Sequence, residues 1–108
     1  MTESRGLEEG SDAPPARAGA IVRILRICNE KGLHARASAK FVQTVERFDA
    51  DVRVIRGSDI VGGTSIMGLM SLAAACGSDI MIDAVGPEAE AAVAAIEALV
   101  SGRFGEDS

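Results

Sequence analysis

The stretch "GLHARASAKFVQTVERF", residues 32–48, contains the only histidine of the chain and an apolar repeat typical of a helix. The apolar side chains of this repeat are Ala37, Phe41, Val45 and Phe48. Their spacings of four, four and three residues match a helix that is buried along one side. The stretch therefore predicts a helix that begins near residue 35, directly after His34.

Segments with strand character flank this helix on both sides. Residues 20–28, "AIVRILRIC", and residues 50–56, "ADVRVIR", are rich in β-branched and apolar side chains, which favour strands. In the first segment Arg23 and Arg26 have opposite parity, so its alternation is imperfect. A turn at "GSD" and the short, glycine-weakened segment 60–63 predict a hairpin with the second strand.

The second half of the chain predicts a helix, a strand and a further helix. Residues 64–76, "TSIMGLMSLAAAC", begin with a Thr-Ser pair that can cap a helix, and residues 77–85 have a turn and an apolar run typical of a strand. The clearest helical stripe follows Pro87 and consists of Ala89, Ala92, Val93, Ile96, Leu99 and Val100. The β-α-β-β-α-β-α order predicts an α+β domain whose antiparallel or mixed sheet is covered by helices on one face.

The length and composition indicate one small domain. The chain has 108 residues, 47% of them apolar, which is enough for a single modest core. Residues 1–19 are rich in Glu, Gly, Ser, Ala and Pro and predict a disordered N-terminal tail, because they offer little apolar surface to bury. We expect the folded domain to span residues 20–102 and residues 103–108 to form a flexible C-terminal tail.

Charge and cysteine usage exclude several classes of protein. The formal net charge of -5 argues against binding to nucleic acid or to an anionic membrane surface. No apolar run approaches the roughly 20 residues that a bilayer span needs, so we expect no membrane insertion and a cytoplasmic protein. Cys28 and Cys76 lack the spacing of metal ligands, so we expect free thiols and no metal site.

The position of His34 suggests phosphoryl chemistry. The N-terminus of a helix carries unpaired N–H groups and a partial positive charge, which disfavour the imidazolium form and attract an anion. The N–H groups of Ala35, Arg36 and Ala37 would face that anion, and the Arg36 guanidinium suits phosphate oxygens. Gly32 allows the preceding loop an unusual backbone conformation. These features predict a site where a phosphoryl group can rest on an imidazole nitrogen.

The same residues do not describe a complete enzyme. The sequence has no second histidine, no evident carboxylate motif near His34 and no Walker-type phosphate loop. Such a chain would need other proteins to donate and to receive the phosphoryl group, and it would need no cofactor. The structural alternative is that His34 is an ordinary exposed residue at a helix start.

Two stretches resemble one known family. "GLHARASAK", residues 32–40, is similar to the active-site segment of HPr, the histidine-containing phosphocarrier of the phosphoenolpyruvate-dependent phosphotransferase system. "GGTSIMGLMSLAAACGSDIMI", residues 62–82, resembles the second signature of that family, which includes nitrogen-branch NPr-type members. The resemblance implies an open-faced β-sandwich with a four-stranded antiparallel sheet and three helices.

The resemblance also implies a mechanism. Phosphorylated Enzyme I would donate a phosphoryl group to Nδ1 of His34, Arg36 would help to hold it, and a IIA-type protein would accept it. Ser65 matches a serine that HPr kinase/phosphorylase modifies in some members, although its simple role is a helix cap. The family's partner surface would map onto Ala35, Ala39, Gln43, Ile66, Met67 and Met70. The chain would act as a monomer.

The sequence departs from the family pattern at several positions. Ala37 replaces the usual proline, and Gln43, Glu46 and Gly68 stand where sugar-transport members carry lysines. These changes slightly favour a regulatory phosphorelay over sugar uptake. A hypothesis from another class is a small-ligand-binding regulatory module that uses helix N-termini to hold an anionic metabolite without covalent histidine chemistry.

Overall fold

A computed structural model describes residues 17–108 and has the element order that the sequence predicts. The elements are β1 (Ile21–Arg26), α2 (Ala35–Val45), β2 (Asp51–Arg56), β3 (Asp59–Gly62), α3 (Ile66–Ser71), β4 (Asp79–Val85), α4 (Ala89–Ser101) and the short 3-10 helix η1 (Arg103–Gly105). Most of the predicted N-terminal tail, residues 1–16, lies outside the described residues. The domain boundaries themselves stay predictions.

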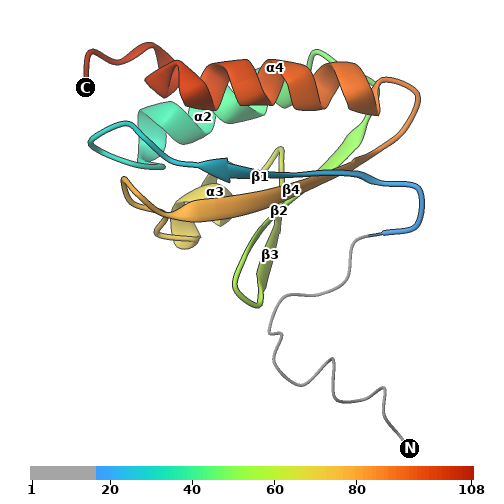
Figure 1. The fold of residues 1–108 in the computed structure, drawn as a ribbon, viewed down its shortest axis with the longest axis horizontal. Helices are drawn as coiled ribbons and strands as arrows, with labels where there is room; N and C mark the ends of the chain where they lie inside the picture. Colours follow the sequence, from blue (N-terminus) through green and yellow to red (C-terminus); the bar gives the residue numbers. More distant parts are fainter. Residues whose placement is uncertain (1–16) are drawn as a thin grey trace, which may run out of the picture.

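The four strands form one antiparallel sheet in the order β1-β4-β2-β3. Alternate residues of β4, namely Ile80, Ile82 and Ala84, face the helices and are buried. Figure 1 shows α4 and α2 lying side by side over the sheet. Phe41 of α2 and Ile96 of α4 are fully buried in this layer. The predicted open-faced α+β sandwich is confirmed.

The two arginines of β1 have different environments, which explains the imperfect alternation. Arg23 shares the face of the buried Leu25 but lies on an edge strand, where its Nε is 3.9 Å from the Glu97 carboxylate of α4. Arg26 lies on the opposite face, and its Nε donates to Asp79 of β4 at 3.1 Å. A strand at the edge of a sheet can therefore accept a charge on its helix-covered face.

The open face of the sheet contains a buried carboxylate, Asp83 in β4. Arg53 of β2 donates to it from Nε at 3.0 Å and from a terminal nitrogen at 2.6 Å. Arg17 donates to it at 2.8 Å and also to the Asp51 carboxylate at 2.7 Å. Burial alone would raise the pKa of Asp83, but the hydrogen bonds from Arg53 and Arg17 lower it to about 2. This cluster fixes Arg17, just before β1, against the middle of the sheet.

Helix α3 is shorter than the segment 64–76 that the sequence favours. It ends because Ala73 adopts a left-handed conformation with φ of +52°, which takes the chain out of the helix. The chain then places the carbonyl of Ala74 against the loop before α2, where it accepts a hydrogen bond from the Leu33 N–H at 3.0 Å. The early end of α3 therefore supports the loop that carries His34.

The C-terminal segment after α4 packs against the domain, where the sequence suggested a flexible tail. Arg103 and Phe104 both have positive φ, which turns the chain back after α4, and the Phe104 side chain is fully buried. Lys40 of α2 donates to the Phe104 carbonyl at 2.6 Å. Figure 1 shows the C-terminus at the same end of the molecule as the loop before α2. The segment therefore reaches the predicted site.

Candidate functional site

His34 occupies the N-cap of α2, as the sequence predicts. Its backbone is extended, and its carbonyl accepts the first helical hydrogen bond, from the Ser38 N–H at 2.9 Å. The N–H groups of Ala35, Arg36 and Ala37 have no hydrogen-bond partner within residues 17–108. Three free donors at a helix N-terminus form an anion site. The imidazole is 27% exposed and stands beside this site.

The loop before His34 is held from two sides. Gly32 has φ of +68°, and a Cβ at this position would collide with the Ala74 carbonyl oxygen, so only glycine fits without distortion. The fully buried Asn29 donates from Nδ2 to the Gly32 carbonyl at 2.9 Å, and the Leu33 N–H binds Ala74. The histidine therefore projects from a fixed backbone.

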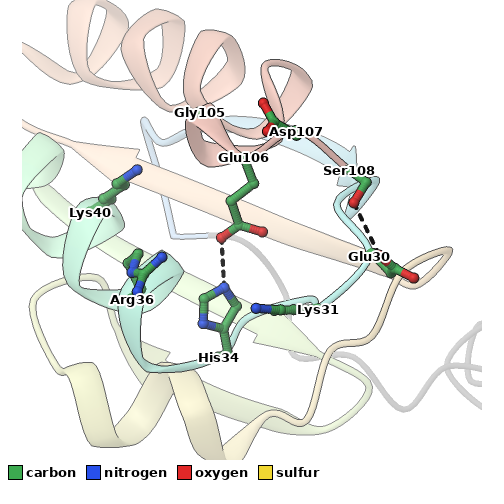
Figure 2. A pocket seen from close by; sticks show the side chains of 9 residues that line it. All are labelled: Glu30, Lys31, His34, Arg36, Lys40, Gly105, Glu106, Asp107 and Ser108. Atoms are coloured by element: carbon green, nitrogen blue, oxygen red, sulfur yellow. Dashed lines mark hydrogen bonds and ion pairs between the residues drawn. The ribbon is translucent and has the colours of Figure 1, made fainter.

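A pocket of about 380 Å³ beside His34 is lined by both basic and acidic side chains, the acidic ones being Glu30, Glu106 and Asp107. Figure 2 shows that Lys31, Arg36 and Lys40 contribute to its wall. Lys40 is bound to the Phe104 carbonyl, whereas the Arg36 guanidinium has no hydrogen bond or ion pair within the described part of the chain. Arg36 is exposed and remains available to bind phosphate oxygens. The predicted pair of His34 and Arg36 thus shares one pocket.

A carboxylate that sequence reasoning missed lies against the imidazole. Oε2 of Glu106 is 2.6 Å from Nε2 of His34, and Oε1 of the same group accepts from Asn29 Nδ2 at 3.0 Å (Figure 2 shows the contact with His34). The Asn29 hydrogen bond, followed by that of His34, holds the pKa of Glu106 below its usual range. Glu106 is therefore ionised at neutral pH and acts only as an acceptor.

No local motif could have revealed Glu106, because it is 72 residues from His34 along the chain. The one available signal was Phe104, a large apolar residue in the segment "GRFGEDS". Such a side chain favours burial. It could have indicated that the chain stays with the domain after residue 102.

Ser65 is the N-cap of α3. Its hydroxyl oxygen accepts a hydrogen bond from the Gly68 N–H at 2.9 Å, and the residue is exposed. The structure thus places it in the capping role that the sequence allows. Its modification stays a prediction.

The six residues predicted for the partner surface reach solvent to different degrees. Ala35 and Gln43 of α2 are exposed, and Ala39 is half-buried. In α3, which packs beside α2, Met67 is 77% exposed and Ile66 and Met70 are each 39% exposed. Three large apolar side chains on one short helix form an exposed patch, the α3 patch (Ile66, Met67 and Met70).

Residues 17–108 contain no cluster of three or more His, Cys, Asp or Glu side chains able to hold a metal ion. Cys28 and Cys76 are both free and exposed. Within the same residues no helix is long and apolar enough to cross a membrane.

Comparison with known proteins identifies the family of this chain. Residues 21–102 match the family model described as the PTS HPr component phosphorylation site. The chain is 40% identical to the phosphocarrier protein HPr of Treponema pallidum, with 81% of this chain and 99% of that protein covered. It is 46% identical to HPr of Neisseria meningitidis serogroup A, over 76% and 92% of the two chains. It is 38% identical to the phosphocarrier protein NPr of Shewanella violacea, over 82% and 97%.

A solved structure supports the same assignment. The crystal structure of HPr-C-His from Thermoanaerobacter tengcongensis matches with a TM-score of 0.78 and 36% identity, and the match covers 82% of this chain and 99% of that one. The family-model match, over residues 21–102, spans both motifs. The chain belongs to the HPr family of phosphocarrier proteins of the phosphotransferase system.

Proposed function

We propose that the chain accepts a phosphoryl group from phosphorylated Enzyme I on Nδ1 of His34 and passes it to a IIA-type protein. The observation that carries this proposal is the position of His34 at three free N–H groups, beside a guanidinium with no partner in the described residues. A IIA-type acceptor, a cytoplasmic location and a monomeric working state complete the proposal. The family relatives include both HPr and NPr proteins, so sugar uptake and a regulatory relay are both compatible with it.

In the transfer the lone pair of Nδ1 attacks phosphorus and forms an N–P bond. The bond between phosphorus and the donor atom of Enzyme I breaks, and its electron pair stays on the donor. The free N–H groups of residues 35–37 and the Arg36 guanidinium stabilise the charge on the phosphoryl oxygens, because both are donors that are already in place. The return step to a IIA-type protein reverses these bonds on a new acceptor atom.

The docking surface in this proposal combines the start of α2 with the α3 patch. Exposed apolar side chains beside a reactive group favour a transient protein partner, because their burial contributes to binding. Met67 is the most exposed of them and the best candidate for insertion between partner side chains. A modification of Ser65 by HPr kinase/phosphorylase would add negative charge at the edge of this surface.

The experiment is phosphorylation of the purified chain with phosphoenolpyruvate, Mg²⁺ and Enzyme I, followed by mass spectrometry. We expect one phosphoryl adduct that acid removes and that His34→Ala abolishes. A second reaction with an added IIA-type protein should return the chain to its original mass.

The control is a known HPr that the same Enzyme I phosphorylates. If that control reacts and this chain does not, the carrier proposal fails. Saturable binding of an anionic metabolite would then favour the ligand-binding module.

A further inference from the structure

We propose that Glu106 is a positioning residue that holds the proton of the neutral His34 ring on Nε2 and so keeps the lone pair of Nδ1 free for phosphorus. This role rests on the proposed function, because it concerns the nitrogen that accepts the phosphoryl group. The observation behind it is the 2.6 Å contact between the side-chain Oε2 of Glu106 and the imidazole Nε2 of His34.

The contact determines which nitrogen carries the proton. An ionised carboxylate has no proton to donate, so Nε2 must be the donor in this hydrogen bond. A neutral imidazole with a proton on Nε2 has its lone pair on Nδ1. The carboxylate therefore selects the tautomer that can attack through Nδ1, as a buried aspartate selects the tautomer of a catalytic histidine in serine proteases.

Asn29 fixes the orientation of Glu106. Its Nδ2 donates both to the Gly32 carbonyl at 2.9 Å and to Oε1 of Glu106 at 3.0 Å. Both partners are acceptors, so the amide has to present its nitrogen to them and its oxygen elsewhere. That oxygen is buried and has no hydrogen-bond partner within residues 17–108. An unpartnered buried acceptor is costly, which indicates that the two donated bonds set the position of this side chain.

The backbone around Glu106 is anchored as well. Two residues earlier, the Phe104 side chain is fully buried and its carbonyl accepts from Lys40. One residue later, the Asp107 carbonyl accepts from the Arg103 guanidinium at 3.0 Å. Side chains that are held on both sides position a reacting group more accurately than a mobile terminus would.

The arrangement suits phosphoryl transfer in both directions. When Nδ1 attacks phosphorus, the proton on Nε2 stays where it is, so no base has to remove a proton. After the transfer, the Nε2–H of the phosphorylated ring still donates to Glu106. The negative carboxylate also stabilises positive charge that develops on the ring during the attack.

Glu106→Gln is the sharpest variant, because Asn29 decides how the new amide lies. Asn29 Nδ2 would bind the glutamine oxygen, so the glutamine nitrogen would face the ring and donate to its Nε2. The ring proton would then move to Nδ1 and block the nucleophile. We expect phosphorylation by Enzyme I to slow by about tenfold or more, since a wrong histidine tautomer costs up to about 10⁴-fold in serine proteases.

Glu106→Ala and the control Glu90→Gln complete the set of variants. Alanine removes the contact without imposing the wrong tautomer, so we expect a smaller loss of rate than with glutamine. Glu90→Gln makes the same glutamate-to-glutamine change in the first turn of α4, outside this pocket, where the exposed side chain has no hydrogen bond or ion pair within residues 17–108, and we expect a rate within about twofold of the parent. Backbone NMR spectra of all variants establish that each is folded.

Two measurements decide the proposal. The ¹⁵N shifts of the imidazole report the tautomer directly, and single-turnover phosphorylation with Enzyme I reports the rate. We expect Nε2–H in the parent, Nδ1–H in Glu106→Gln, and rates that fall in the order parent, Ala, Gln. If Glu106→Gln keeps Nε2–H, matches Glu90→Gln in rate or reacts faster than Glu106→Ala, the positioning role is wrong.

Failure of the proposed phosphocarrier function would give a different experimental result. In that case the parent chain itself acquires no phosphoryl group from active Enzyme I, whatever the tautomer of the ring, and the positioning role falls with it. If the parent reacts at His34 but the variants do not differ, only the role of Glu106 is overturned.

Discussion

In the proposed function, His34 becomes the reactive group because of its surroundings and not because of its own chemistry. Its backbone starts a helix whose first three N–H groups have no partner among the described residues 17–108, and its ring contacts the Glu106 carboxylate. The N–H donors of residues 35–37 therefore lie where phosphoryl oxygens would bind. The Glu106 carboxylate lies where it can accept the proton of Nε2. One histidine is sufficient for a carrier that leaves the remaining chemistry to its partners.

Substitutions of Arg36 test its proposed contact with the phosphoryl group. Arg36→Ala removes a bidentate donor from the phosphoryl site, and we expect single-turnover phosphorylation by Enzyme I to slow by about tenfold or more. Arg36→Lys keeps the charge but not the planar fork, so it should restore only part of the rate.

The matched control is Arg47→Ala, which removes the same charge just beyond the other end of α2, where Arg47 lies over the Phe48 ring. We expect it to react at the parent rate. Equal rates for both alanine variants would contradict a role for Arg36 at the phosphoryl group.

At the scale of elements, the sheet depends on the cluster around Asp83. A carboxyl whose pKa is about 2 in the folded chain and 3.8 in its ordinary state stabilises the fold by about 2 kcal/mol. Because the folded pKa is the lower one, this contribution is present above pH 4 and is lost as the pH falls from about 4 towards 2. Chemical denaturation between pH 6 and pH 2 should show the loss.

Asp83→Asn provides the comparison. It leaves Arg17 and Arg53 without their buried counter-ion, so we expect a loss of about 3 kcal/mol or more at pH 7. The difference in stability between parent and variant should shrink as the pH is lowered. A constant difference from pH 6 to pH 2 would mean that this carboxyl does not titrate as described.

Helix α3 allows stability and docking to be separated. In Ser65→Asp the new carboxylate can still accept from the Gly68 N–H, because aspartate is as good an N-cap as serine. We expect the melting temperature to stay within a few degrees of the parent. The KM of Enzyme I for this chain should rise several-fold, because charge is added beside the α3 patch.

Ser58→Asp places the same charge in the exposed turn between β2 and β3 and serves as the control. Its KM should stay at the parent value. If the rise in KM of Ser65→Asp is fully explained by a lower melting temperature, the docking role is contradicted. Ser65 would then act only as the cap of α3.

At the scale of the whole molecule, the order of helices and strands could be predicted well from the sequence. Each helix or strand has its own characteristic spacing of apolar residues. The stripe of Phe41 and Val45 and the alternation in β4 follow directly from burial on one side. The end of α3 at Ser71 was not predictable, because the left-handed conformation of Ala73 that follows it reflects tertiary contacts of the next residues. The predicted helix therefore extended too far.

The candidate site was predictable only in part, for the same reason. His34 and Arg36 are neighbours in sequence, and a helix start could be inferred around them. Asn29 and Glu106 meet at the ring only because α4 returns the chain to the loop before α2 and Phe104 is buried there. Contacts between segments so far apart have no signature in a single sequence.

The most direct measurement of the central claim is an NMR spectrum of the ¹⁵N-labelled chain before and after phosphorylation by Enzyme I. The chain has one histidine, so its two ring nitrogens can be assigned without ambiguity. We expect the phosphoryl group on Nδ1 of His34, with Nε2 still protonated and bound to Glu106. A phosphoryl group on Nε2, or on any residue other than His34, would contradict the account.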